Sequence, residues 1–130
     1  MTEQRITFKE MCARFDVTPR TLRYYEYIEL LHPHKEGRAR FYGPREIARM
    51  TLILRGRRFG FSLEEIRQWL LIYDKRGSRE QYQVWIEMAD RQLAVLDRQI
   101  ADIKAARADL AQLRDTGAAE LAAMTDDAAD

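Results

Sequence analysis

The longest segment without a helix breaker constrains this chain more than any other feature. Between Ser78 and Arg114 there is neither proline nor glycine, and residues spaced alternately by four and three fall on one line. Eight of the ten residues on this line are apolar or aromatic, and the other two are Arg107 and Arg114. A seven-residue repeat with two apolar positions is typical of a coiled-coil seam, which is narrower than the apolar stripe of a globular core.

A helix over residues 79–114 would extend roughly 54 Å at about 1.5 Å per residue, too far to fold back on so small a domain. An intramolecular hairpin is the alternative to a partner chain, but no breaker lies between Gln81 and Arg114. We therefore expect a homodimer. Its contacts would come from the apolar seam residues Tyr82, Ile86, Ala89, Leu93, Leu96, Ile100, Ile103 and Leu110.

The sequence predicts three segments along the chain. Residues 1–76 would form the folded head, and residues 77–116 the dimerisation helix. We expect this helix to end at Asp115-Thr-Gly117, where glycine interrupts the pattern. Residues 117–130 are rich in alanine and aspartate, and they carry too little apolar bulk to pack firmly, so a flexible tail is expected there.

Charge is divided unevenly between the two halves. Residues 1–58 carry 13 Lys and Arg against 7 Asp and Glu, a net charge of +6, whereas residues 59–130 carry 9 against 14, a net charge of −5. The net charge of the whole chain, +1, hides this difference. A basic N-terminal half favours contact with a polyanion.

Two short helices are predicted in the basic half. Thr7 and Glu10 form a capping box before a helix whose apolar face carries Phe8, Met11, Cys12 and Phe15. Thr18 is an N-cap for a second helix with Pro19 at its first position. Because Asp16-Val17 is so short a link, the pair predicts a helix-turn-helix whose second helix can enter a major groove. We expect its exposed positions to carry Arg20, Arg23, Tyr24 and Tyr25.

The rest of the head is predicted as a wing followed by two helices. Residues 34–42 alternate basic residues with small or aromatic ones around Gly37, which indicates a two-stranded wing. A third helix would begin at Pro44 and end at Gly60, and a fourth would follow the capping box of Ser62 and Glu65. Because the helix–turn–helix layout repeats, the end of this third helix, from Arg55 to Gly60, would form a second wing that touches the DNA backbone.

Four motifs together resemble the MerR (mercury-resistance-regulator) family of bacterial transcription factors. They are Leu22-Arg-Tyr-Tyr-Glu26, Leu30-Leu31, Arg40-Phe-Tyr42 and Phe59-Gly-Phe-Ser-Leu-Glu-Glu-Ile66, in the family's order and spacing. The likeness covers residues 6–71. The chain departs from the family at Asp16 and Glu29, where many members have glycine, and in the wing, which reads Gly37-Arg-Ala-Arg40. Aspartate tolerates the left-handed backbone better than glutamate does.

The resemblance implies a mostly α-helical fold: a winged helix-turn-helix head, a helix pair, and a long helix that forms an antiparallel coiled coil. It implies a homodimer that binds a pseudo-palindromic promoter element and bends and untwists the spacer for RNA polymerase. By motif position, Arg20, Arg23 and Tyr24 would contact the major groove, while Arg38, Arg40 and Tyr42 would hold the wing on phosphates. The full set expected to contact double-stranded DNA is Thr18, Arg20, Thr21, Arg23, Tyr24, Tyr25, Arg38, Arg40, Tyr42, Arg55 and Arg58.

Other classes of function have less support in the sequence. No activated nucleophile, paired catalytic carboxylates or glycine-rich phosphate loop is recognisable, so we expect no enzyme and no cofactor. We expect Cys12, the single cysteine, to be a buried apolar residue, and His32 and His34 make an incomplete metal site, so no metal is expected. A small effector would have to bind near the aromatic residues, but these are expected to pack the head against the long helix: Trp69, Tyr73, Tyr82 and Trp85.

The cell compartment and two alternative roles complete the predictions. No membrane span or secretory signal is visible, and one cysteine gives no pointer to an oxidising compartment, so the cytoplasm is expected. The alternative with the same features is an architectural protein that bends DNA without a dedicated effector response. A coiled-coil adaptor would share only the second half. Binding to one dominant palindromic promoter site, rather than uniformly along the genome, distinguishes the regulator from the architectural protein.

Overall fold

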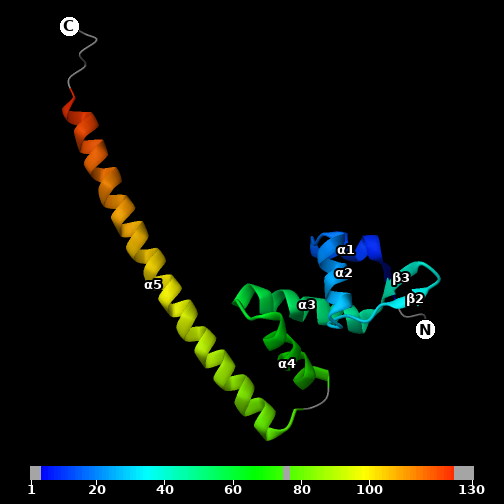
Figure 1. Ribbon diagram of the computed structural model, residues 1–130. Helices are drawn as coiled ribbons and strands as arrows, with labels where there is room; N and C mark the ends of the chain where they lie inside the picture. The colour runs from blue at the N-terminus through cyan, green and yellow to red at the C-terminus, as the bar shows by residue number, and fades with distance from the viewer. Residues whose placement is uncertain (1–3, 75–76, 125–130) are drawn as a thin grey trace. The chain divides into compact units, whose positions relative to one another are not determined.

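The computed structural model describes residues 4–74 and 77–124 (Figure 1). The described chain is mostly helical with one small sheet, as predicted. Its elements in chain order are β1 (Ile6–Thr7), α1 (Phe8–Phe15), α2 (Pro19–Tyr27), β2 (His34–Glu36), β3 (Ala39–Tyr42), α3 (Pro44–Phe59), α4 (Leu63–Asp74) and α5 (Arg79–Ala123).

Three helices begin at the caps predicted from the sequence. The Thr7 hydroxyl accepts a hydrogen bond from the Glu10 N–H at 3.1 Å, and the Glu10 carboxylate accepts one from the Thr7 N–H at 2.9 Å. The Thr18 hydroxyl accepts from the backbone of Thr21 at 3.1 Å. Ser62 and Glu65 repeat the reciprocal arrangement before α4. Each cap satisfies backbone donors that a helix start leaves unpaired, which fixes where the chain turns into the helix.

The wing is a hairpin within a three-stranded antiparallel sheet, in the order β1-β3-β2. The hairpin was predicted, and in the structure Lys35 lies opposite Arg40; β1 was not predicted. β1 pairs Ile6 with Tyr42 and Thr7 with Phe41, residues far along the chain. The additional strand ties the base of the wing directly to the start of α1.

Two turns use the left-handed backbone at residues other than glycine. Asp16, which follows α1, has a φ of 52°, and Glu29, which follows α2, has a φ of 63°. These are the two positions at which the sequence departs from the glycine of many relatives. The turn geometry is therefore kept without glycine, at a cost of about 1 kcal/mol for such a residue.

The core of the head joins all of its helices to the wing. Its buried members are Met11, Leu22, Tyr25, Leu30, Leu31, Tyr42, Met50, Ile53, Phe61, Ile66 and Leu70. The apolar face predicted for α1 packs here, and Cys12 is one of the partly buried residues against the core, as expected. Gly56 lets α3 approach α4 closely, because a Cβ atom there would lie 2.7 Å from the Ile66 side chain.

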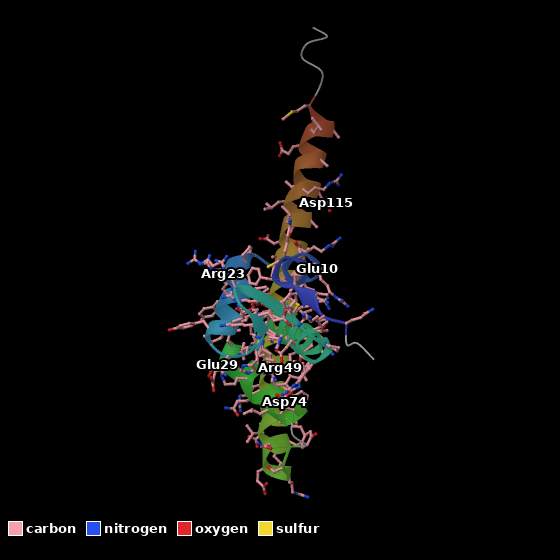
Figure 2. The ribbon with its side chains drawn as sticks, turned by 90° about the vertical axis from the view of Figure 1, so that its right-hand side faces the viewer. Glu10, Arg23, Glu29, Arg49, Asp74 and Asp115 are labelled. Atoms are coloured by element: carbon pink, nitrogen blue, oxygen red, sulfur yellow. The ribbon has the colours of Figure 1, made fainter. Side chains whose placement is uncertain are left out.

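A buried arginine ties α3 to two other parts of the head. Arg49 is 8% exposed, and its Nε donates a hydrogen bond to the Leu30 carbonyl at 3.0 Å. Its Nη1 donates to the carboxylate of Asp74, the last residue of α4 (Figure 2). The Asp74 carboxylate is half-buried and neutralises this guanidinium, which would be costly to leave unpaired in the core.

The long helix α5 begins as predicted but ends later. Ser78 and Gln81 cap its start reciprocally, at 3.2 Å and 2.8 Å. The predicted end at Asp115-Thr-Gly117 was wrong, because α5 continues to Ala123 (Figure 1). Alanines around Gly117 favour the helix enough to offset one glycine, which costs about 1 kcal/mol. By internal contacts the chain divides into two units, with the division after Glu87, inside α5. Residues 125–130 of the predicted tail lie outside the described residues.

Candidate nucleic-acid interface

The second helix, α2, supplies the first candidate surface. Its start is fixed by the Thr18 cap and by Pro19 at the first helical position. Leu22 and Tyr25 face the core, so Arg20, Arg23 and Tyr24 are left on the outer side. Figure 2 shows Arg23 projecting away from the head. The expectation that Tyr25 is exposed was wrong, because its side chain is only 6% exposed and belongs to the core.

A groove of about 630 Å³ runs beside α2, and we call it the α2 groove. Three guanidinium groups and three tyrosine side chains lie along it, drawn from α2, the end of α3 and the start of α4. Its lining residues are Arg20, Thr21, Arg23, Tyr24, Tyr25, Tyr27, Arg57 and Leu63. Guanidinium donors beside aromatic faces suit phosphates and base edges.

The arginine of α3 that lines the α2 groove is not one of those that were predicted to contact DNA. Residues 55–59 form the last turns of α3, and the chain turns at Gly60, whose φ is 92°, so the predicted end of this helix is confirmed. A second wing at this end stays a prediction. Arg57 lines the groove, although the sequence analysis left it out of the DNA-contact set. Arg55 lies over the ring of Phe59 at 6.0 Å, and Arg58 is exposed. Arg55 precedes Phe59 by four residues, which is one helical turn, so the sequence alone could have assigned Arg55 to this ring rather than to the groove.

A second hollow, of about 320 Å³, lies between the wing and α2, and we call it the wing hollow. Arg23 lines both this hollow and the α2 groove, so one side chain belongs to both. The other lining residues are Thr7, Phe8, Lys9, Arg38, Ala39, Arg40 and Phe41. Lys9 was not predicted as a site residue, but its position in the first turn of α1, next to β1, places it at this hollow.

An aromatic ring holds two of these cations in place. The Arg23 guanidinium carbon lies 5.6 Å from the Phe8 ring centre, and that of Arg40 lies 5.7 Å from it. Such contacts are worth roughly 0.5–1 kcal/mol at exposed sites. Phe8 thereby orients one arginine from α2 and one from the wing toward the same hollow.

Two residues that were expected to contact DNA, Tyr42 and Arg40, contact the carboxylate of Glu26 beneath the wing. Tyr42 is fully buried, and its hydroxyl donates a hydrogen bond to Glu26. The expectation that Tyr42 contacts phosphates was therefore wrong, because it lies in the core. The Arg40 Nε lies 3.1 Å from the other Glu26 oxygen, so this guanidinium is partly neutralised. Burial and the bond to Glu26 hold the pKa of Tyr42 above its ordinary value.

Three other residues that were predicted to contact DNA lie at the surface of the head or at the start of α2. Arg38 is exposed in the turn of the wing, and Thr18 and Thr21 stand at the start of α2, although the Thr18 hydroxyl already serves as the cap.

Burial raises the pKa of the Cys12 thiol. Within residues 4–74 and 77–124 no three His, Cys, Asp or Glu side chains gather in a way that could hold a metal ion. Trp69 is buried beside Phe59, at 6.4 Å between ring centres, whereas the Tyr73 side chain lies outside the described structure.

None of the helices in the described part of the chain combines the length and the hydropathy that crossing a bilayer requires.

Two family models match the chain. Residues 6–71 match the model described as MerR HTH family regulatory protein, and residues 47–113 match the one described as MerR, DNA binding. The regulator HmrR of Rhizobium leguminosarum bv. viciae is 32% identical over 105 residues, which cover 80% of each chain.

Solved structures share the fold. A MerR-family transcriptional regulator from Bacillus cereus has a TM-score of 0.70 at 27% identity, covering 87% of this chain and 82% of its own. HiNmlR, a MerR-family regulator lacking the sensor domain and solved bound to promoter DNA, has a TM-score of 0.62 at 18% identity, covering 78% and 76%. One family model matches half of the chain, and one relative aligns with this chain over four fifths of its length. Together these matches establish the family. The chain belongs to the MerR family of helix-turn-helix, DNA-binding transcriptional regulators.

Proposed function

We propose that this regulator acts as a homodimer on a pseudo-palindromic promoter element, with α2 in the major groove and the wing on the flanking phosphates. The observation that carries the proposal is the position of Arg23, which lines both the α2 groove and the wing hollow. A side chain there can reach a base edge while its neighbours in both hollows hold the sugar-phosphate backbone. Backbone contacts fix the position of the head on the duplex, and base contacts supply specificity.

The distribution of charge supports one sequence-reading helix flanked by phosphate contacts. Arg20 and Arg57 line the α2 groove on one side of Arg23, and Lys9 and Arg38 line the wing hollow on the other. Each cation that neutralises a phosphate releases counterions, so binding must weaken as salt rises. Arg40 contributes less charge, because Glu26 pairs with it.

The second half of the molecule supports a dimer. In the single chain the seam of α5 is open to solvent, with Leu93 56% exposed and Ile103 68% exposed. A stripe of this kind is stable in water only when another apolar surface covers it. A two-fold protein matches a two-fold DNA site, with one head on each half-site. We further propose that the dimer acts in the cytoplasm, bends and untwists the promoter spacer, and thereby controls access of RNA polymerase, without catalysis of its own.

The test is DNA binding by an Arg23→Ala variant. We would first identify the bound sites by sequencing DNA captured in cells, then measure fluorescence anisotropy on one such site and on a scrambled duplex. Losing a base contact costs about 1–3 kcal/mol, so the specific site should bind about 5- to 150-fold more weakly. The scrambled duplex should lose less. Arg98→Ala, on the exposed side of α5, is the matched control and should change neither affinity.

Two results would contradict the proposal. Unchanged affinity of Arg23→Ala for both duplexes would remove α2 from the interface. Footprints spread uniformly over genomic DNA, rather than one dominant palindromic promoter site, would instead favour an architectural DNA-bending protein.

A further inference from the structure

We infer that two copies of α5 pair in one particular antiparallel register, in which Arg107 lies beside the partner's Asp97 and Arg114 lies beside the partner's Asp90. This inference rests on the proposed homodimer and on the antiparallel pairing that the family resemblance implies, and it adds the register and the ion pairs that fix it. The centre of the pair would fall between Ala101 and Asp102, where Ile100 of each copy packs against the partner's Ile103.

The apolar seam is longer than the sequence analysis predicted. Beyond Gly117 the same spacing of four and three continues to Leu121 and Met124, and both side chains are exposed, at 71% and 67%. α5 remains helical to Ala123, so the seam runs along nearly its whole length. Three positions interrupt it, and all three lie in the C-terminal half: Arg107, Arg114 and Gly117.

A parallel pair would place each interruption against itself. Two Arg107 side chains would face each other in one layer and two Arg114 side chains in another, and like charges in contact oppose association. Two Gly117 residues would leave a gap in a third layer, where apolar contacts would be missing. An antiparallel pair instead places the interruptions against the continuous N-terminal half of the partner's seam.

The proposed register matches each interruption to a complementary residue. Arg107 would pack across the partner's Leu96 with its guanidinium at the partner's Asp97, which follows that leucine. Arg114 would cross the partner's Ala89, whose small side chain leaves room for the arginine to reach the partner's Asp90. Gly117 would face the partner's Ile86. Each of the four resulting ion pairs per dimer would join an arginine in the seam to an aspartate that lies directly beside the partner's seam. Charged and polar residues at such positions select the register of a coiled coil.

The neighbouring registers are less favourable. Sliding one helix by seven residues in one direction places Arg107 beside the partner's Lys104, a like charge. Sliding it in the other direction places Arg114 beside the partner's Tyr82 and the partner's Gln83, so its charge has no acidic neighbour in the seam. Only the central register gives both arginines a carboxylate.

The described structure leaves these charges available. Among the residues it describes, Arg107, Asp90 and Asp97 form no ion pair. Arg114 contacts Asp115 at 2.9 Å, but both side chains are more than 70% exposed, and such surface pairs contribute little. Arg114 can therefore exchange this contact for one with a partner.

Cysteine cross-linking tests the register directly. In a Cys12→Ala background, the full-length variants Leu93→Cys and Leu110→Cys are purified separately and mixed after brief dissociation. Oxidation should then link residue 93 of one copy to residue 110 of the other. Neither variant should cross-link when oxidised alone. A mixture of Leu93→Cys with Ile103→Cys, which would link only after a shift of seven residues, is the matched control and should remain unlinked.

Each contrary result has a separate meaning. Cross-linking of either variant alone, or a link between residues 93 and 103, overturns the register while leaving the homodimer intact. A dimer by sedimentation that forms no link between residues 93 and 110 does the same. Sedimentation as a single chain overturns the homodimer of the proposed function itself.

Charge reversal supplies a second, independent test. Arg107→Asp should raise the dimer dissociation constant at least about tenfold, because two repelling pairs form in each dimer. Adding Asp97→Arg should restore dimerisation, since the charges are exchanged and not removed. Arg98→Asp, one residue from Asp97 but on the outer side of the helix, should have less than about a twofold effect. An Arg107→Asp variant that dimerises like the unmodified protein, or a double variant that is not restored, overturns the register.

Discussion

The hydroxyl group of Tyr42 connects the wing to the recognition helix, and Tyr42→Phe tests what this connection contributes. The side chain is fully buried, so the substitution removes one oxygen atom from the core without opening a path to solvent. That oxygen donates to Glu26, whose side chain is only 10% exposed. A hydrogen bond to a charged group contributes about 1.5–3 kcal/mol, and without it Glu26 keeps only its ion pair with Arg40.

We expect the free energy of unfolding at pH 7 to fall by about 1.5–3 kcal/mol in Tyr42→Phe. With a urea dependence of roughly 1–3 kcal/mol per molar, the unfolding midpoint should fall by about 1 M. The measurement is urea denaturation followed by circular dichroism, with the protein concentration held equal because a dimer's stability depends on it. Tyr27→Phe is the control, since Tyr27 is 83% exposed, and its midpoint should not move measurably.

The difference between the two proteins should depend on pH in a known direction. The folded state holds the pKa of Tyr42 above its ordinary value of about 10, first by burial and then through the bond to Glu26. Stability from such a group is complete below pH 10 and declines above it, because the unfolded tyrosine ionises while the folded one does not. At pH 11 the advantage of the unmodified protein over Tyr42→Phe should have shrunk by about 1.4 kcal/mol. Equal midpoints at pH 7, or a difference that does not shrink, would refute this account.

Three further substitutions test other parts of the molecule. Arg38→Ala should weaken binding to all DNA sequences alike and flatten the slope of log affinity against log salt by about 0.9, measured by anisotropy titrations between 50 and 200 mM salt; an unchanged slope would remove the wing from the phosphates. Arg49→Met should lower the unfolding free energy by about 2–3 kcal/mol by chemical denaturation, because Asp74 and the Leu30 carbonyl lose a donor, whereas Arg45→Met should cost under about 0.5 kcal/mol. Thr18→Ala should cost about 1 kcal/mol through the lost cap, measured as a lower melting temperature, and no change would show that α2 needs no side-chain cap.

Local chemistry explains most of what was predictable from the sequence. The caps at Thr7, Thr18 and Ser62 involve residues three positions apart, so the sequence alone contains both partners of each bond. The hairpin of the wing and the start of α5 are local in the same way. The resemblance to a family added the antiparallel pairing of the long helix and the DNA contacts that were carried over by motif position.

What was missed depends on contacts between distant residues. β1 is two residues long and forms because β3 lies beside it, which no local pattern indicates. Tyr25 and Tyr42 carry polar groups compatible with a surface, but both are buried in the core that the elements of the head form together. Glu26 is the residue that decides the second case, since a carboxylate under the wing gives the Tyr42 hydroxyl a partner away from solvent. The choice of Arg57 over Arg55 likewise followed from where α3 ends relative to α2.

The left-handed turn at Glu29 has an evolutionary consequence. A glutamate codon becomes a glycine codon by a single base change, and glycine would relieve about 1 kcal/mol of backbone strain at this φ of 63°. Lineages that acquire this change would gain a margin of stability, measurable as a higher melting temperature. They could then accumulate a mildly harmful mutation on the DNA-reading surface, such as one that alters operator preference, without falling below the threshold for folding.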